Sequence, residues 1–327
     1  MITLRSLLCG LALGAGALVP AHADEPAREL APGLLLLPGQ LQESRSPDGN
    51  SVLLLGTEGL LVVDTGRNDA HTQALLGRIA QLGVPVRAVV NTHWHLDHIG
   101  GNAQFKARLP EVRILAHPSL DTALATFHAE NRAQLQEYLA TTPPDAPIRP
   151  RLTAELELLK LDRLLAHTDP VTEPLALNLG ERVVEVRVAA HSVTEGDLWL
   201  WDPASRTVIA GDLVTLPVPL FDTACPEGWQ ATLASLDAVE FATLIPGHGQ
   251  PLTKAEFALW RDAFDRLLAC AANPGAKPRC VDAWMKDLAP LTAEEDDEYA
   301  RQLLNYYFDN NLNPLAPGRK RWCGAVG

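Results

Sequence analysis

His93-Trp94-His95-Leu96-Asp97-His98 places three imidazoles and one carboxylate within six residues, in a chain that has only 10 histidines. An apolar stretch, residues 86–90, precedes the hexapeptide, which therefore stands where a predicted strand ends and a loop begins. Alternate side chains of an extended segment point the same way, so the first two histidines can face one point. The aspartate and the third histidine, in the following turn, can face a second point. Metal sites need such converging donors, so the hexapeptide predicts a metal centre rather than a solvated polar loop.

Further ligands are expected after other strands of the chain. Three residues with metal-binding side chains each follow an apolar stretch, as the hexapeptide does: His191 after residues 181–188, Asp212 after 207–210 and His248 after 243–245. Because each of them begins a loop at the end of a predicted strand, we expect them to serve the same centre. His71, His117 and His128 lack comparable neighbours, so we expect them to be core or surface residues.

The surrounding pattern alternates apolar strands with amphipathic helices. Ahead of the hexapeptide we expect strands at 33–37, 51–56 and 59–66 and a helix at 69–82. After it come a strand near 114–117, a proline-interrupted helical insertion at about 119–167 with a helix at 153–165, and strands at 181–188, 198–201 and 207–210. A helix at 229–239, a strand at 243–245 and helices at 254–270 and 293–308 complete the pattern. Two similar halves of this kind predict an α/β fold.

The chain resembles the metallo-β-lactamase superfamily over about residues 33–250. The resemblance rests on HxHxDH followed by His, Asp and His, together with the strand Leu61-Val-Val-Asp64-Thr-Gly66. It implies an αββα sandwich and two zinc ions per chain. One zinc would be bound by His93, His95 and His191, and the other by Asp97, His98 and His248, with Asp212 bridging both. Asp64 would brace the ligands from behind.

One segment departs from the family pattern. The usual His-Thr-x-Gly-Asp is broken here by two extra residues between His191 and Thr194-Glu-Gly-Asp197. His167, in His-Thr-Asp-Pro, imitates the pattern but precedes the strand instead of following it, so we keep His191 as the ligand and treat His167 as a loop residue.

The implied reaction is a hydrolysis. Two metals can hold a hydroxide that attacks an ester, thioester, lactone, amide or phosphoester, with Asp97 ligating one metal and orienting the nucleophile. An aspartate at position 212 resembles glyoxalase-II-like hydrolases and is atypical of true β-lactamases, which leaves antibiotic hydrolysis as an alternative. An iron-dependent dioxygenase of the sulfur-oxidising type is a second alternative, since imidazole suits both zinc and iron. A non-catalytic binding module is the third.

The net charge and the N-terminal sequence indicate which partners and which compartment to expect. The formal net charge of −13 disfavours a nucleic-acid partner and fits a small-molecule substrate. Arg5, an apolar run and Ala21-His22-Ala23 predict a cleaved signal peptide at residues 1–23 and a periplasmic or secreted protein, and we expect no membrane span after its removal. We expect a catalytic domain at 24–252 and a helical extension at 253–327, while the oligomeric state is open.

Four cysteines remain after the predicted cleavage. In an oxidising compartment they are compatible with two disulfides. Cys270 and Cys280 flank a short Pro/Gly loop and are the first expected pair, which leaves Cys225 with Cys323. Free buried thiols are the alternative. The role of the helical insertion is also open between a wall or lid of the site and a surface decoration.

Overall fold

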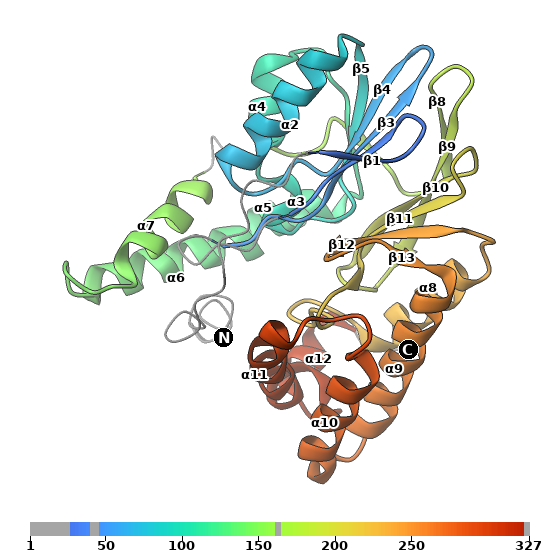
Figure 1. The fold of residues 1–327 in the computed structure, drawn as a ribbon. Helices are drawn as coiled ribbons and strands as arrows, with labels where there is room; N and C mark the ends of the chain where they lie inside the picture. The colour runs from blue at the N-terminus through green and yellow to red at the C-terminus, as the bar shows by residue number, and fades with distance from the viewer. Residues whose placement is uncertain (1–26, 40–45, 161–164, 324–327) are drawn as a thin grey trace. The chain divides into compact units, whose positions relative to one another are not determined.

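The computed structural model describes residues 27–39, 46–160 and 165–323. The predicted signal peptide lies outside these ranges. The chain divides into two compact units (Figure 1). The first comprises Met1–Thr172 with Leu177–Val183, and the second comprises Glu173–Ala176 with Val184–Gly327. The hexapeptide belongs to the first unit, while the three later candidate ligands belong to the second.

The first unit is built on a seven-stranded sheet whose strands follow one another in chain order. The strands are β1 (Arg28–Ala31), β2 (Leu34–Leu37), β3 (Ser51–Gly56), β4 (Gly59–Val63), β5 (Val86–Val90), β6 (Ile114–Ala116) and β7 (Asp169–Pro170). β1 to β4 pair antiparallel, and β4 to β7 pair parallel. The parallel register pairs Val63 with Val90, so Asp64 and the residues before the hexapeptide leave the sheet side by side.

Helices cover this sheet because their apolar residues face it. α2 (Asp69–Leu82) ends at Gly83, whose φ of 66° is a left-handed cap. Leu75 and Ile79 of α2, with Phe105 of α4 (Asn102–Arg108), pack in one buried cluster with strand residues. Burial of such side chains stabilises each by about 1.5–3 kcal/mol. α3 (Leu96–Ile99) is a single turn inside the hexapeptide.

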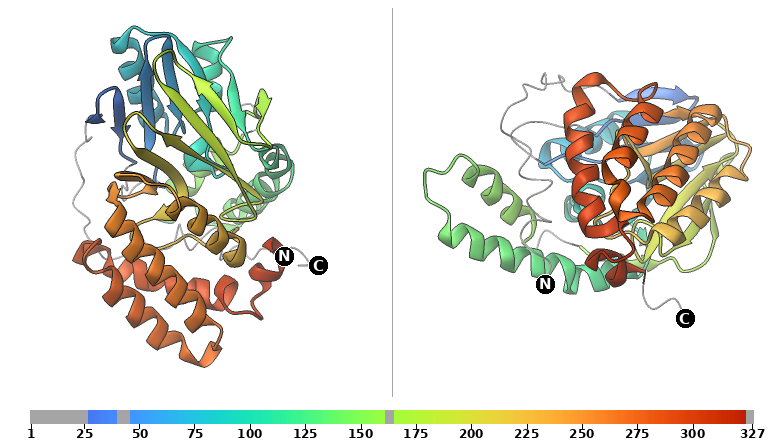
Figure 2. Two further views of the ribbon diagram at one scale, coloured as in Figure 1. Left: turned by 90° about the vertical axis from the view of Figure 1, so that its right-hand side faces the viewer. Right: turned by 90° about the horizontal axis from the view of Figure 1, so that it is seen from below.

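The expected insertion is helical, as predicted. It consists of α5 (Ser119–Ala125), α6 (Phe127–Thr141) and α7 (Arg149–Leu158), and the last two form a hairpin that projects from the unit (Figure 2). The predicted bounds of 153–165 for its last helix are wrong, because α7 begins four residues earlier and ends at Leu158. Pro150 sits in the first turn, where a proline lacks no needed hydrogen bond, so it starts the helix instead of breaking it.

The second unit carries a six-stranded sheet in the order β13-β12-β11-β10-β9-β8. Its strands are β8 (Leu175–Asn178), β9 (Val183–Ala190), β10 (Gly196–Asp202), β11 (Thr207–Thr215), β12 (Thr243–His248) and β13 (Leu252–Thr253). The predicted ends of two strands are wrong: β11 runs on through Asp212, and β12 includes His248. β11 is buried along its whole length, and it therefore extends beyond the apolar stretch from which the strand was predicted.

Helices follow the sheet in the second unit. They are α8 (Pro226–Asp237), α9 (Lys254–Ala271), α10 (Lys277–Leu288), α11 (Asp297–Tyr307) and α12 (Pro317–Trp322), with short turns η1 (Pro274–Ala276), η2 (Glu294–Asp296) and η3 (Phe308–Leu312). α9 starts at a capping box, in which Thr253 and Glu256 exchange side-chain to backbone hydrogen bonds. α10 was not expected from the sequence, although Trp284 and Leu288 on its apolar face are buried. No helix among the described residues is long and apolar enough to cross a membrane.

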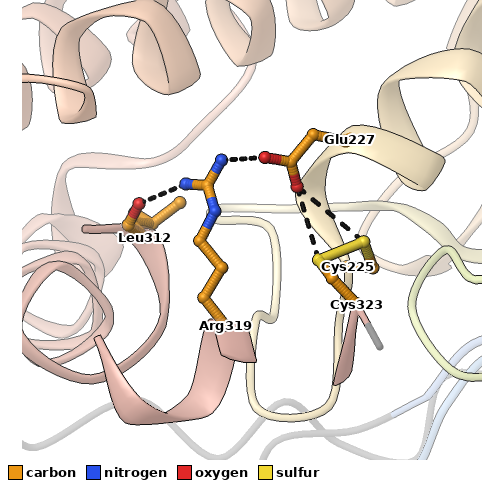
Figure 3. The surroundings of a disulfide bond; sticks show 5 residues. All are labelled: Cys225, Glu227, Leu312, Arg319 and Cys323. Atoms are coloured by element: carbon orange, nitrogen blue, oxygen red, sulfur yellow. Dashed lines mark hydrogen bonds and ion pairs between the residues drawn. A yellow bond between two sulfur atoms is a disulfide. The ribbon is translucent and has the colours of Figure 1, made fainter. Parts of the chain in front are cut away.

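Both expected disulfides are confirmed, and with them the alternative of free thiols falls. Cys270 pairs with Cys280, and Cys225 pairs with Cys323 across 98 residues. Around the second disulfide, Glu227 Oε2 lies 3.8 Å from Cys225 Sγ and 3.4 Å from Cys323 Sγ, and Arg319 pairs with the other carboxylate oxygen (Figure 3). The C-terminal segment is thereby attached to the start of α8.

Candidate metal centre

The hexapeptide brings its three imidazole rings close together. The ring centroid of His93 lies 4.5 Å from that of His95 and 4.2 Å from that of His98. Asp97 Oδ2 lies 3.7 Å from His98 Nε2. His95 is the last extended residue before α3, so the turn of α3 brings Asp97 and His98 back beside the first two histidines. The predicted clustering within the hexapeptide is therefore observed.

Asp64 supports His98 from behind. Its carboxylate accepts hydrogen bonds from the Thr92 N–H (2.7 Å), the Thr92 hydroxyl (2.8 Å) and His98 Nδ1 (2.8 Å). Its φ of 59° is a left-handed conformation that is uncommon outside glycine and is typical of constrained sites. Burial raises the pKa of Asp64, and His98 and Thr92 oppose that rise. When Asp64 is ionised its carboxylate only accepts, and His98 then carries its proton on Nδ1 and presents the Nε2 lone pair, as a metal ligand must.

A glycine makes room for the same imidazole. A Cβ on Gly49 would lie 2.5 Å from His98 Cε1 and 2.8 Å from its Nε2. The Gly49 N–H also donates to the Asp97 carbonyl at 3.1 Å. Position 49 therefore accepts only glycine while His98 keeps this orientation.

A buried arginine stands between Asp97 and the helical insertion. Arg67 Nη2 donates to Glu155 Oε1 of α7, and Arg67 Nη1 lies 3.9 Å from Asp97 Oδ1. Ser46 Oγ donates to the second carboxylate oxygen of Glu155 at 3.2 Å. Burial by itself lowers the pKa of Arg67, but Glu155, Asp97 and Asp48 outweigh that effect and raise it. Arg67 is therefore a permanent cation beside the hexapeptide.

The two spacer residues of the hexapeptide also pack on the insertion. Trp94 contacts Phe127, with ring centroids 4.9 Å apart, and its carbonyl accepts a hydrogen bond from His128 Nε2 at 3.0 Å. Burial lowers the pKa of His128 to about 4, so the imidazole is neutral at physiological pH. Leu96 belongs to a buried cluster with four leucines of the insertion: Leu135, Leu139, Leu152 and Leu159. The loop that carries the candidate ligands is thus anchored on one side by the insertion.

In the second unit, the parallel strands β11 and β12 place Asp212 beside His248. His248 Nε2 lies 3.6 Å from Asp212 Oδ1, and the register pairs Gly211 with Pro246. A Cβ on Gly247 would lie 1.9 Å from Asp212 Oδ1. The glycine of Pro-Gly-His248 is therefore required by the Asp212 carboxylate, which is 98% buried.

His191, the remaining candidate ligand of the second unit, lies at the end of β9. It follows β9 with a φ of 50° and is exposed to solvent. The two extra residues after it form a tight turn, in which the His191 N–H donates to Glu195 O (3.1 Å) and Ser192 N–H to Thr194 O (2.9 Å). The N–H and the hydroxyl of Thr194 donate hydrogen bonds to the two carboxylate oxygens of Asp197, at 3.1 and 3.0 Å. Burial raises the pKa of Asp197 to about 7, Thr194 opposes the rise, and Asp212 adds to it.

Among the described residues, His71, His117 and His167 lie outside the candidate donor sets and have partners of their own. His71 hydrogen-bonds Ser51 at 2.9 Å, His117 hydrogen-bonds Ser119 at 2.9 Å, and His167 lies 3.0 Å from Asp121. Sequence reasoning missed the supporting residues Gly49, Arg67, Glu155, His128 and Gly247. Only Gly247 carried a signal, since it lies inside Pro-Gly-His248-Gly.

A comparison with known protein families gives one match, and it covers both candidate donor sets. The model of the metallo-beta-lactamase superfamily matches residues 47–248, more than half of the chain. The chain belongs to the metallo-β-lactamase superfamily. The resemblance seen in the sequence is thereby confirmed, and so is the α/β fold class, which consists here of two sheets with helices.

Curated members of the superfamily to which the chain is similar are hydrolases. A linear primary-alkylsulfatase from Pseudomonas sp. (strain ATCC 19151) is 27% identical over 218 residues, which cover 61% of this chain and 41% of the relative. A hydroxyacylglutathione hydrolase from Thermosynechococcus vestitus is 38% identical over 45 residues, 14% of this chain and 18% of the relative. The chain therefore spans less than half the length of these relatives.

Among solved structures, a metallo-β-lactamase from Pontibacter korlensis aligns with a TM-score of 0.54 at 16% identity, over 71% of this chain and 94% of the other. At that identity the likeness shows the metallo-β-lactamase fold and nothing more specific.

The donor chemistry of the superfamily's metal centre fits the residues of the hexapeptide. Neutral imidazoles and a carboxylate are the ligands that zinc takes, and they also suit iron. The Asp64–His98 pair has the form in which a carboxylate fixes the tautomer of a metal-binding histidine.

Proposed function

We propose that this chain is an exported zinc-dependent hydrolase with two zinc ions per chain. The observation that carries the proposal is the gathering of three imidazoles in the hexapeptide, with His98 oriented by a buried carboxylate. Membership of a superfamily whose curated members here are hydrolases supports the reaction type.

The proposed ligands are those that the family pattern implies. One zinc would be held by His93, His95 and His191 and the other by Asp97, His98 and His248, with Asp212 as a ligand common to both. Zinc bound in this way would supply a hydroxide at neutral pH and would polarise the substrate oxygen. The chain's own contribution is positional: Asp64 sets the tautomer of His98, and Asp97 orients the attacking nucleophile.

The proposed substrate has an ester-like bond: an ester, thioester, lactone, amide or phosphoester. The similarity to an alkylsulfatase adds sulfate esters to that range. An aspartate at position 212 favours such general hydrolysis over the hydrolysis of β-lactam antibiotics. The two disulfides support export, because disulfides persist in oxidising compartments.

Metal content and hydrolysis measured together test the proposal. The full chain is purified, its metals are determined by elemental analysis, and the enzyme is assayed on carboxylic ester, thioester, lactone, phosphoester, sulfate ester and nitrocefin substrates. We expect two zinc ions per chain and hydrolysis that a chelator abolishes and added zinc restores. His93→Ala must lose both, whereas His117→Ala, which removes a histidine outside the donor sets, must keep both. One iron per chain with oxygen consumption and no hydrolysis would sink the proposal.

A further inference from the structure

Besides its apolar contacts, the helical insertion is linked to the hexapeptide by a cation, Arg67, which interacts with one acid on each side. The side chains of Arg67, Glu155 and Asp97 are 15%, 7% and 12% exposed, so all three charges are largely withdrawn from water. The arginine is hydrogen-bonded to Glu155, whereas its nearest approach to Asp97 is the 3.9 Å between Nη1 and Oδ1. That distance is outside hydrogen-bonding range.

This asymmetry has a consequence for Asp97. A guanidinium binds carboxylates bidentately, through the same oxygen lone pairs that a metal needs. Charges attract one another more strongly where water is excluded, so Arg67 without Glu155 would turn to Asp97 as its nearest acid. Glu155 thereby holds the guanidinium at ion-pair distance from the candidate ligand but outside hydrogen-bonding range.

We propose that Glu155 is a positioning residue for the metal centre: by holding Arg67, it keeps the Asp97 carboxylate available to the metal. The inference rests on the proposed function, because it requires Asp97 to bind zinc. It also assigns a task to the insertion, which is to support the ligand loop and not merely to decorate the surface.

The surroundings of Glu155 fit this task. Ser46 Oγ holds its second oxygen at 3.2 Å, so the carboxylate is fixed at both ends. Leu152 on α7 and Leu159 directly after it, about one turn to either side of Glu155, belong to one buried cluster with Leu96, the residue before Asp97. The helix that carries Glu155 is therefore in register with the loop that carries Asp97, and the Arg67 contact is held by packing as well as by charge.

Zinc titration of the metal-free full chain tests the inference in three variants and a control. Glu155→Gln removes the negative charge that competes with Asp97 for Arg67, so we expect one of the two zinc ions to bind about 10- to 100-fold more weakly, the usual effect of losing an outer-shell partner. Arg67→Met leaves no guanidinium to hold off and must bind zinc at least as tightly as the wild type. The double variant must recover the wild-type affinity. The control is Glu157→Gln, which removes an exposed acid on α7 that pairs with Lys160, two residues beyond the end of the helix.

The recovery in the double variant separates positioning from plain structural support, since the loss of a support would not be repaired by removing its partner. The inference would be overturned if E155Q bound zinc as tightly as the wild type, or if the double variant bound it as weakly as E155Q. In both cases, binding of two zinc ions by the wild type would leave the proposed function standing. Weaker zinc binding by R67M than by the wild type would also overturn the inference. This measurement does not depend on whether E155Q folds. A wild type that binds no zinc would sink the proposed function and the inference together.

Discussion

Replacing Asp64 by asparagine changes the proton of one imidazole and little else. Asparagine has the same shape and tolerates the left-handed φ of 59° at this position. The Thr92 N–H can still donate to its amide oxygen. The amide nitrogen then stands opposite His98 Nδ1, where it can only donate. His98 must therefore accept at Nδ1 and carry its proton on Nε2, the nitrogen that faces the proposed metal.

The magnitude follows from the hydrogen bonds at Asp64 Oδ2, which accepts from both His98 Nδ1 and the Thr92 hydroxyl and which the variant replaces by an amide donor. A hydrogen bond to a charged group contributes about 1.5–3 kcal/mol, and outer-shell partners of metal-bound histidines contribute about 10- to 100-fold in metal affinity. At about 1.4 kcal/mol per factor of ten the two estimates agree. We expect Asp64→Asn to weaken zinc binding by that factor, while the metal-free protein loses no more than about 3 kcal/mol of unfolding free energy.

Zinc affinity is measured by competition with a chromophoric chelator, and unfolding of the metal-free protein is followed by circular dichroism. Asp48→Asn is the matched control, because Asp48 is a buried carboxylate that accepts from Arg67 N (2.7 Å), Asn68 N (2.8 Å) and Asn68 Nδ2 (2.9 Å). It should lose stability without losing zinc. Wild-type zinc affinity in D64N, or an equal loss in D48N, would refute the role given to Asp64.

Three further predictions concern stability and space. Burial depresses the pKa of His128 from 6.5 to about 4, so the unfolded chain binds more protons between these values. The unfolding free energy should fall by on the order of 3 kcal/mol from pH 6.5 to pH 4. His128→Gln keeps a donor for the Trp94 carbonyl but cannot titrate, so its unfolding free energy should lack this dependence on pH. Denaturant titrations at several pH values measure the difference. Replacing both cysteines of the Cys225–Cys323 disulfide should cost about 4.7 kcal/mol and replacing those of Cys270–Cys280 about 3 kcal/mol, because the closed loops span 98 and 10 residues; the opposite order in urea unfolding contradicts this reasoning. Gly247→Ala drives a methyl group onto Asp212 Oδ1 and should lower zinc affinity at least about tenfold, whereas Gly77→Ala, in open space on α2, should leave zinc binding unchanged and stabilise the fold by about 0.5–1 kcal/mol.

Local spacing explains which elements could be predicted. The strands around 34–37, 51–56 and 86–90 and the helices at 69–82 and 254–270 stand where periodicity puts them, because each repeats its apolar residues at the period of its own backbone. β11 fails this test beyond residue 210, since its last residues are buried by neighbouring chain and not by an apolar pattern. α7 fails it at the start, where Pro150 was interpreted as a break.

By itself, the sequence determined the family and the residue types that stand at its motif positions. Each of these follows from residue types within a few positions of one another, or from an order of motifs along the chain. Only the tertiary structure decided what supports the donors: Glu155 meets Arg67 across 88 positions, and His128 meets the Trp94 carbonyl across 34. Such contacts leave no local period, because they depend on where α6 and α7 pack after the chain has folded. The physical reason is that side-chain type is written in the sequence, whereas the neighbour that fixes its charge, tautomer or position is supplied by packing between distant segments.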